Sequence, residues 1–150
     1  MAAKNTTKDV ADKLSVLLAD SYILTLKTQA YHWNVKGEHF AALHKMFEEQ
    51  YNELAPAIDE VAERIRALGQ ITPASFDEFS KLSSVKSTGG QPKWTEMVEN
   101  LLKDHKTAAA SARTVIEAAE AVDDSVSADL ATERVAFHDK TIWMLGALVS

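Results

Sequence analysis

Two histidines and three carboxylates in the first half of the chain have the residue types and the spacing of metal ligands. His44 and Glu48 are four residues apart, as are Asp59 and Glu63, so each pair would share one face of a helix. His32 precedes both pairs. Imidazole nitrogens and carboxylate oxygens together form a ligand set that suits iron or zinc. We therefore take all five residues as candidate metal ligands.

The spacing places this candidate site between two subunits. If one helix carries both His44 and Asp59, 59 − 44 = 15 residues separate them, or roughly 22 Å at about 1.5 Å per residue, which one chain cannot close on a single ion. The ligand face also lies about a third of a turn away from the apolar stripe that contains Phe47 and Leu54. A symmetric antiparallel partner would bring His44 of one chain beside Asp59 and Glu63 of the other, twice in each dimer.

Four long helices are expected to position these residues, because apolar side chains recur at helical spacing and strand-like alternation is absent from the sequence. Gly37 and Gly69 are expected stop signals, and Ser127 is the expected N-cap of the last helix. Pro56 should bend the second helix or remove one of its backbone hydrogen bonds. The expected helices span Thr7 to about Asn34, about Glu38 to Leu68, about Trp94 to Val122, and about Ser127 to Val149.

The segment over residues 70–93 interrupts the helical pattern. Two prolines, a glycine pair and a serine-containing polar run indicate a loop, within which a short helix is expected over residues 75–81. The segment is long enough to cross a bundle from end to end. This order of elements predicts an all-α, single domain over residues 1–150. The domain is a four-helix bundle of ferritin-like topology, with a short extra helix in the long crossover and a short N-terminal tail over residues 1–8.

Composition excludes several classes of protein. The chain of 150 residues is long enough for one core, and it contains no cysteine, so disulfides and thiolate metal sites are excluded. No apolar run approaches the ~20 residues needed to span a bilayer, and the N-terminus lacks the apolar core of a signal peptide. We therefore expect a cytoplasmic protein without a membrane segment. The net charge of −6 should repel nucleic acid.

Three motifs stand out along the chain. They are His32-Trp33-Asn34-Val35-Lys36-Gly37 with Phe40, Leu43-His44 and Phe47-Glu48-Glu49; Asp59-Glu60-Val61-Ala62-Glu63-Arg64-Ile65; and His138-Asp139-Lys140 with Trp143-Met144-Leu145. Together they resemble the motifs of the Dps family, the DNA-binding proteins from starved cells, which are ferritin-like miniferritins. The resemblance implies a hollow shell of twelve subunits built from two-fold dimers. It also implies Fe(II) binding at sites shared between subunits, oxidation preferably by hydrogen peroxide, and storage of a ferric mineral that protects against oxidative damage.

The resemblance assigns the ferroxidase ligands residue by residue. It implies that His32 and His44 come from one subunit and Asp59 and Glu63 from its partner, and that Glu48 is a further acidic residue near the Fe(II)/Fe(III) site. Glu48 could instead be an outer acceptor that holds His44. Without the family, Asp59 and Glu63 would be interpreted as solvated charges that pair with a neighbouring arginine.

Three further residues receive roles from the same resemblance. Trp33, beside His32, could donate an electron or intercept radicals, although packing at an interface is the alternative interpretation. Asp124 and Asp129 match acidic positions that line an iron pore of the family. A helix N-terminus also attracts acidic residues because of its dipole, which is the alternative for both.

Two other functions remain open at this point. A DNA-binding and DNA-protecting nucleoid protein would coat DNA with its shell, but the tail here offers only Lys4 and Lys8, so DNA binding is expected to be weak or absent. An ordinary ferritin would place Glu-x-x-His motifs inside each bundle. No histidine of this chain has a glutamate three residues before it, and His39, His105 and His138 are interpreted as structural or surface groups.

Overall fold

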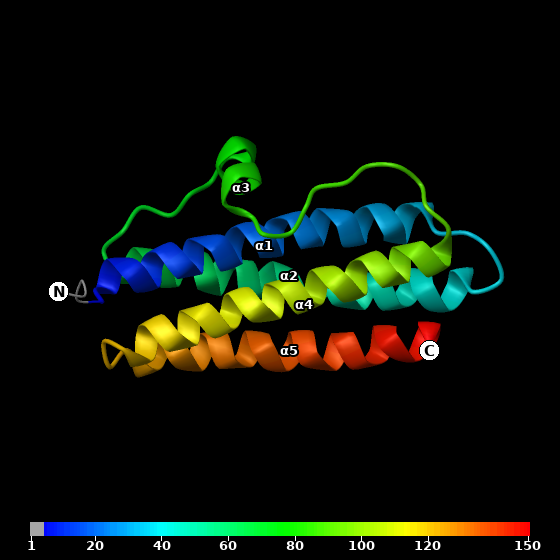
Figure 1. Cartoon of the computed structure of the whole chain (residues 1–150). Coiled ribbons are helices and arrows are strands. Elements are labelled where there is room, and N and C mark those ends of the chain that lie inside the picture. Colours follow the sequence, from blue (N-terminus) through cyan, green and yellow to red (C-terminus); the bar gives the residue numbers. More distant parts are fainter. Residues whose placement is uncertain (1–4) are drawn as a thin grey trace.

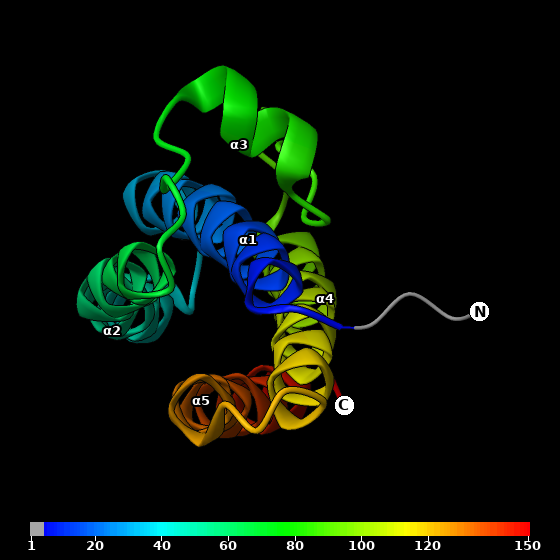
Figure 2. The same ribbon diagram turned by 90° about the vertical axis from the view of Figure 1, so that its left-hand side faces the viewer.

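The computed structural model describes residues 5–150, and its regular structure is entirely α-helical (Figure 1). Four long helices lie alongside one another, and a fifth, short helix lies outside them against α1, as the end-on view shows (Figure 2). Within the described residues there is no strand, so the predicted all-α fold is confirmed. The helices are α1 (Thr7–Asn34), α2 (Phe40–Ala67), α3 (Phe76–Leu82), α4 (Trp94–Glu120) and α5 (Ser125–Val149).

The connections explain why the helices form a bundle of this topology. Short links join α1 to α2 and α4 to α5, which makes each pair antiparallel. The segment between α2 and α4 runs from one end of the bundle to the other and carries α3 (Figure 1). Phe79 of α3 stacks on Tyr22 of α1, with ring centroids 4.7 Å apart, and so anchors the short helix to the bundle. The predicted long crossover with its extra helix is therefore present.

Helix ends follow the local signals with two corrections. Thr6 forms a capping box with Asp9 at the start of α1, so the predicted tail over residues 1–8 overlaps the helix. Lys8 is helical and pairs with Asp12, whereas Lys4 lies outside the described residues. The prediction of Ser127 as N-cap was wrong. Asp124 caps α5, and its side chain accepts a hydrogen bond from the backbone N–H of Ser127.

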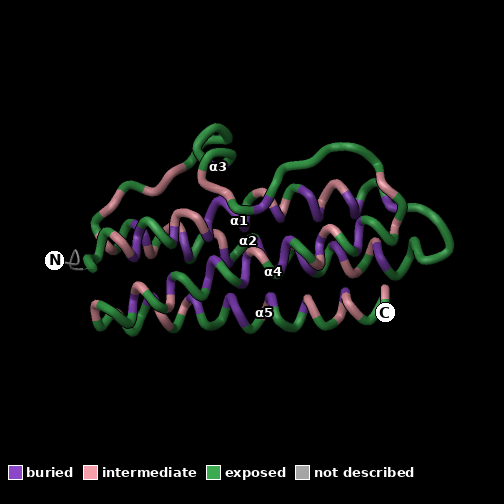
Figure 3. The backbone as a smooth tube through the Cα atoms, in the orientation of Figure 1, coloured by how far each residue is buried: buried purple, intermediate pink, exposed green. Residues whose placement is uncertain are grey.

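The core fixes which face of α2 points outward. Leu43, Phe47, Leu54, Val61 and Ile65 are all nearly inaccessible to solvent, and they form one stripe along the helix. Fully burying such a side chain stabilises the fold by about 1.5–3 kcal/mol, so rotation of α2 about its axis is strongly disfavoured. Buried residues recur along the four long helices, whereas the connecting segments are mostly exposed (Figure 3). Pro56 lies within α2 without ending it.

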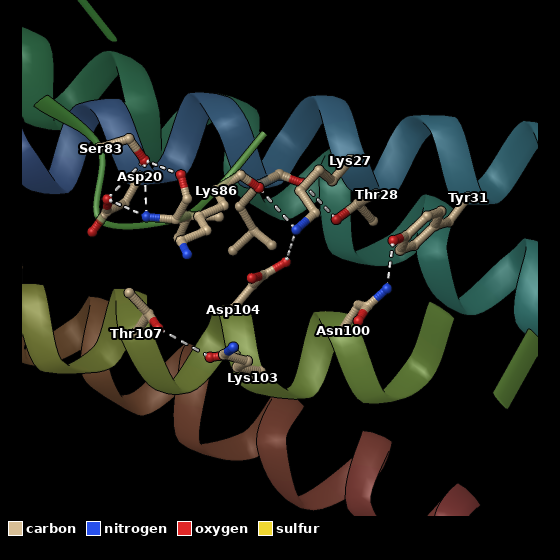
Figure 4. A network of polar contacts seen from close by, with 12 residues as sticks. Asp20, Lys27, Thr28, Tyr31, Ser83, Lys86, Asn100, Lys103, Asp104 and Thr107 are labelled. Atoms are coloured by element: carbon tan, nitrogen blue, oxygen red, sulfur yellow. Dashed lines mark hydrogen bonds and ion pairs between the residues drawn. The ribbon is translucent and has the colours of Figure 1, made fainter. Parts of the chain in front are cut away.

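A buried carboxylate holds the crossover against the bundle. Asp20 of α1 accepts hydrogen bonds from the Ser83 hydroxyl at 3.0 Å and from the Ser84 N–H at 2.6 Å. The Val85 N–H and the Ser111 hydroxyl of α4 complete this set (Asp20 and Ser83 appear in Figure 4). Burial raises the pKa of Asp20, although these four donors oppose the rise. One side chain thereby joins α1, α4 and the crossover.

Candidate metal centre

The two histidines of the first motif lie face to face at one end of the α1–α2 pair. His32 belongs to the last turn of α1 and His44 to the second turn of α2. Their rings are nearly parallel, with centroids 3.7 Å apart and an interplanar angle of 14°. The Nδ1 atom of His32 lies 2.6 Å from the backbone oxygen of His44, and the Nδ1 atom of His44 lies 2.7 Å from the backbone oxygen of His32.

These reciprocal contacts determine the tautomer of both rings. A carbonyl oxygen only accepts hydrogen bonds, so each Nδ1 atom must carry a proton. In the neutral form of each imidazole, the lone pair is then on Nε2. Metal-binding histidines typically donate their other N–H to a carbonyl or carboxylate in this way, which fixes the ring and raises its basicity. The local structure thus leaves the Nε2 atoms of both rings available as candidate metal ligands.

The same contacts stabilise the hairpin that carries them. The last carbonyl groups of a helix lack partners within the helix, and the carbonyl oxygen of His32 in α1 accepts a hydrogen bond from the Nδ1–H group of His44. The last helical residue of α1 is Asn34, Val35 is its C-cap, and Gly37 then adopts a φ of 113°, which a residue with a side chain rarely takes. The chain can therefore turn sharply enough to bring His44 back over His32.

Two aromatic residues that the sequence reasoning missed surround the histidine pair. Phe40 stacks on His44, with centroids 5.0 Å apart, and Tyr51 meets His32 edge to face at 5.2 Å. Phe40 and His44 are four residues apart on α2, and Tyr51 follows His44 by seven, so helical spacing alone could have placed them on the ligand face. They restrict the motion of both imidazoles and cover part of their surface.

The three carboxylates lie on the exposed face of α2. Glu48, Asp59 and Glu63 are exposed, and within residues 5–150 none of them forms a hydrogen bond or a salt bridge. The arginines that could have neutralised Asp59 and Glu63 are engaged elsewhere, since Arg64 pairs with Asp124 and Arg66 bonds the carbonyl of Gln70. These carboxylates are therefore available as ligands.

A single chain does not bring the five candidate ligands together. His32 and His44 meet, whereas Asp59 and Glu63 lie further along α2. Among residues 5–150, no group of three or more histidines and acidic residues is arranged to hold a metal ion. Asp59 instead borders a hollow of about 440 Å³ between α1, α2 and the start of α3. Phe76, 79% exposed, lies at its edge.

The residues assigned to a pore have different environments. Asp124 is largely enclosed: its Oδ1 atom accepts from the Arg64 guanidinium at 2.9 Å and from the Ser127 N–H at 3.0 Å. Partial burial opposes its ionisation, but the Ser127 bonds and the Arg64 charge outweigh this effect and hold the pKa of Asp124 below its ordinary value. Asp129 is exposed on α5.

Trp33, which was given a role in electron transfer, follows His32 directly in the chain. Its side chain is 63% exposed.

The remaining buried histidines form a separate pair inside the bundle. His105 of α4 and His138 of α5 are completely buried, and their Nδ1 atoms share one hydrogen bond of 2.9 Å. Burial lowers the pKa of His105 to about 3, with a smaller effect from the Arg134 charge. Burial and the neighbouring charges lower the pKa of His138 to about 2. Both rings are neutral at physiological pH, as expected of structural groups.

Comparisons with known proteins agree with this architecture. A family profile for ferritin-like domains matches residues 11–150. A low-temperature-induced protein of Nostoc sp. is 37% identical over 142 residues, which cover 93% of this chain and 79% of that protein. DNA protection during starvation protein 2 of Bacillus anthracis is 35% identical over 143 residues, which cover 95% of this chain and 98% of that protein.

A solved structure extends the similarity to three dimensions. The crystal structure of the Dps protein from Vibrio cholerae superposes on this chain with a TM-score of 0.92 and 27% sequence identity, covering 100% of this chain and 99% of that one. That protein is described as a member of a broad superfamily of ferritin-like diiron-carboxylate proteins. No helix within residues 5–150 combines the length and the apolar character needed to cross a membrane.

Proposed function

The chain belongs to the ferritin-like family and, within it, to the Dps proteins, and we propose that it is a ferroxidase that detoxifies and stores iron. Its substrate is Fe(II), its preferred oxidant is hydrogen peroxide, and the ferric product is kept as mineral inside a hollow dodecamer. The reaction takes place where two subunits meet across a two-fold axis. Oxidation of iron by peroxide within the shell keeps both reactants away from the rest of the cell.

The histidine pair is the observation that carries this proposal. Reciprocal Nδ1–H bonds hold the rings of His32 and His44 and leave two Nε2 lone pairs, while the carboxylates of Asp59 and Glu63 have no partner within the described chain. One chain thus carries two separate halves of a ligand set, the histidine pair at one place and the two carboxylates further along α2. A two-fold partner supplies the missing half to both, which makes each dimer carry two sites.

The residues of the site support oxidation in distinct ways. The two imidazoles bind Fe(II) as neutral ligands. Asp59 and Glu63 of the partner add negative charge, which favours Fe(III) over Fe(II) and so assists the transfer of electrons to the oxidant. Two Fe(II) ions supply the two electrons that reduce one hydrogen peroxide to two hydroxide ions. Glu48, one turn after His44, attracts the cation, and Trp33, beside His32, intercepts radicals that escape from this two-electron reaction.

A mixing experiment tests whether the site is shared. One variant carries His32→Asn and His44→Asn, because an asparagine amide can still donate to the opposite carbonyl but lacks the Nε2 ligand. The other carries Asp59→Asn and Glu63→Gln, which keep side-chain shape and remove charge. Each variant alone should lose fast Fe(II) oxidation, which is followed by the absorbance of the ferric product after peroxide is added.

The two variants are then unfolded, mixed in equal amounts and refolded together. In a mixed dimer, one site receives both intact halves and the other receives both defective halves. Random pairing makes roughly half of the dimers mixed, so roughly a quarter of the wild-type number of sites should return. If mass spectrometry confirms mixed assemblies and no fast oxidation returns, the site is not shared between subunits.

Retention of DNA is the second candidate function, favoured by the name of the Bacillus anthracis relative. The chain itself offers little positive charge for it. The net charge is −6, and Lys8 is engaged by Asp12 at 2.7 Å. Binding to a shell through phosphate contacts would weaken steeply with salt. A salt titration of DNA retention at fixed pH therefore distinguishes a nucleoid protein from an iron store.

A further inference from the structure

A polar hollow lies where the crossover passes over α1 and α4, and Figure 4 shows several of the polar side chains that line it, among them Lys27 and Asp104. Its volume is about 530 Å³, which falls within the range of about 300–1,000 Å³ typical of small-molecule sites. Neither iron binding nor the proposed shared site uses any residue of this hollow. Its lining is dominated by polar and charged groups from α1 and from the crossover and α4, which follow one another in the chain.

The floor of the hollow is built from buried polar side chains. Lys27 and Asp104, each 7% exposed, form an ion pair across α1 and α4, and the Lys27 ammonium also donates to the carbonyl of Lys86 at 3.0 Å. Tyr31, 4% exposed, accepts a hydrogen bond from the Asn100 amide at 3.0 Å. The charges of Lys27 and Asp104 cancel. The hydroxyl proton of Tyr31 and one proton of the Lys27 ammonium still lack acceptors within residues 5–150.

The rim adds positive charge and further donors. The ammonium groups of Lys86 and Lys103 form no salt bridge with any residue over 5–150, and both line the hollow (Figure 4). The backbone N–H groups of Thr88 and Gly89, in the exposed part of the crossover, make no hydrogen bond within the described chain. Glu96 is the one lining carboxylate besides the paired Asp104. The hollow thus has a net charge of +1 in a chain whose net charge is −6.

We propose that this hollow binds a phosphate group, either as free phosphate or as a small phosphomonoester. A phosphate offers only acceptor oxygens and negative charge when it is ionised, which complements ammonium groups and unpaired backbone N–H donors. Lysine is an effective phosphate-binding residue as a point charge. The volume exceeds what inorganic phosphate alone requires, so an ester can be accommodated on the Tyr31 and Asn100 side of the floor.

The test is a phosphorus NMR titration on the iron-free assembled protein at low ionic strength. Inorganic phosphate and glycerol 1-phosphate serve as separate probes. Lys86→Gln and Lys103→Gln should each weaken binding about fivefold, the size of effect expected for one exposed charge. Glu96→Gln should tighten binding, because it removes the opposing carboxylate. Lys106→Gln is the matched control, because Lys106 is an exposed lysine of α4, the helix that carries Lys103, and it does not line the hollow.

The outcomes distinguish free phosphate from a phosphomonoester as the ligand, and they can refute the proposed site. Equal binding of both probes identifies free phosphate as sufficient, and tighter binding of the ester identifies a phosphorylated small molecule. The proposal fails if neither probe binds at millimolar concentration. It also fails if Lys106→Gln weakens binding as much as Lys86→Gln, which would indicate general surface charge.

Discussion

The buried pair formed by His105 and His138 should make this protein unusually sensitive to mild acid. The pKa of each ring is lowered by burial, to about 3 for His105 and about 2 for His138. In the unfolded chain both have the ordinary value of about 6.5. Below that pH the two imidazoles bind protons in the unfolded chain but not in the folded chain. The free energy of unfolding therefore falls as pH decreases from about 6.5 towards 3.

The magnitude follows from the size of these shifts. One pKa unit corresponds to about 1.36 kcal/mol, so at pH 5 each ring destabilises the fold by about 2 kcal/mol and the pair by about 4 kcal/mol. We expect the double variant His105→Leu, His138→Leu to lack this loss. In the wild type, the buried Nε2 atoms of both rings have no hydrogen-bond partner. Leucine fills much of the same space and has no polar atom that needs a partner.

Urea unfolding at pH 7 and pH 5, followed by circular dichroism at matched subunit concentrations, measures the effect. The wild type should lose about 4 kcal/mol more stability between the two pH values than the double variant, while carboxylate contributions cancel in the comparison. His39→Gln is the control, since His39 is exposed and should not change the difference. Equal pH dependence in the wild type and the double variant would refute the role assigned to the pair.

Three further outcomes are expected. Light scattering under native conditions should report a closed assembly of about twelve 16.5-kDa chains, and a monomer alone would contradict the shared site. Asp129→Asn should slow Fe(II) uptake strongly at low salt and less at high salt, and unchanged uptake rates would refute the pore. Asp124→Asn should slow uptake as well, and it should also lower the melting temperature because it weakens the ion pair with Arg64. Duplex DNA should be retained weakly at physiological salt, and tight retention after removal of residues 1–8 would reveal an overlooked basic surface.

Helical periodicity was the strongest signal in the sequence. The bounds of α1 agree with the expectation from Thr7 to Asn34, because the apolar spacing and the stop before Gly37 are local features. The other helices differ by at most a few residues at their ends. The start of α5 was placed two residues too late, since both Ser127 and Asp124 are good N-cap types. In the folded chain Asp124 accepts the Ser127 N–H, whereas the Ser127 hydroxyl accepts a hydrogen bond from Arg64.

The candidate site could be only half derived from the sequence. The spacing from His44 to Glu63 indicated a ligand face that points away from the core, and the buried stripe of α2 places that face outward. Helical spacing puts Phe40 and Tyr51 on the same face as His44, but it does not show that their rings contact the imidazoles, which only the folded chain reveals. The hydrogen bonds of the imidazoles were equally out of reach, because their partners are backbone atoms of a different helix.

Sequence alone determined the helices, the ligand types and their separation along α2, because these depend on neighbours within one or two turns. Only the tertiary structure decided which nitrogen of His32 and His44 is free, since the choice follows from carbonyl groups brought together across the α1–α2 link. It likewise paired His105 with His138, which are 33 residues apart, and buried both. Tautomers and shifted pKa values depend on the atoms that surround a group, and these atoms come together only when the chain folds.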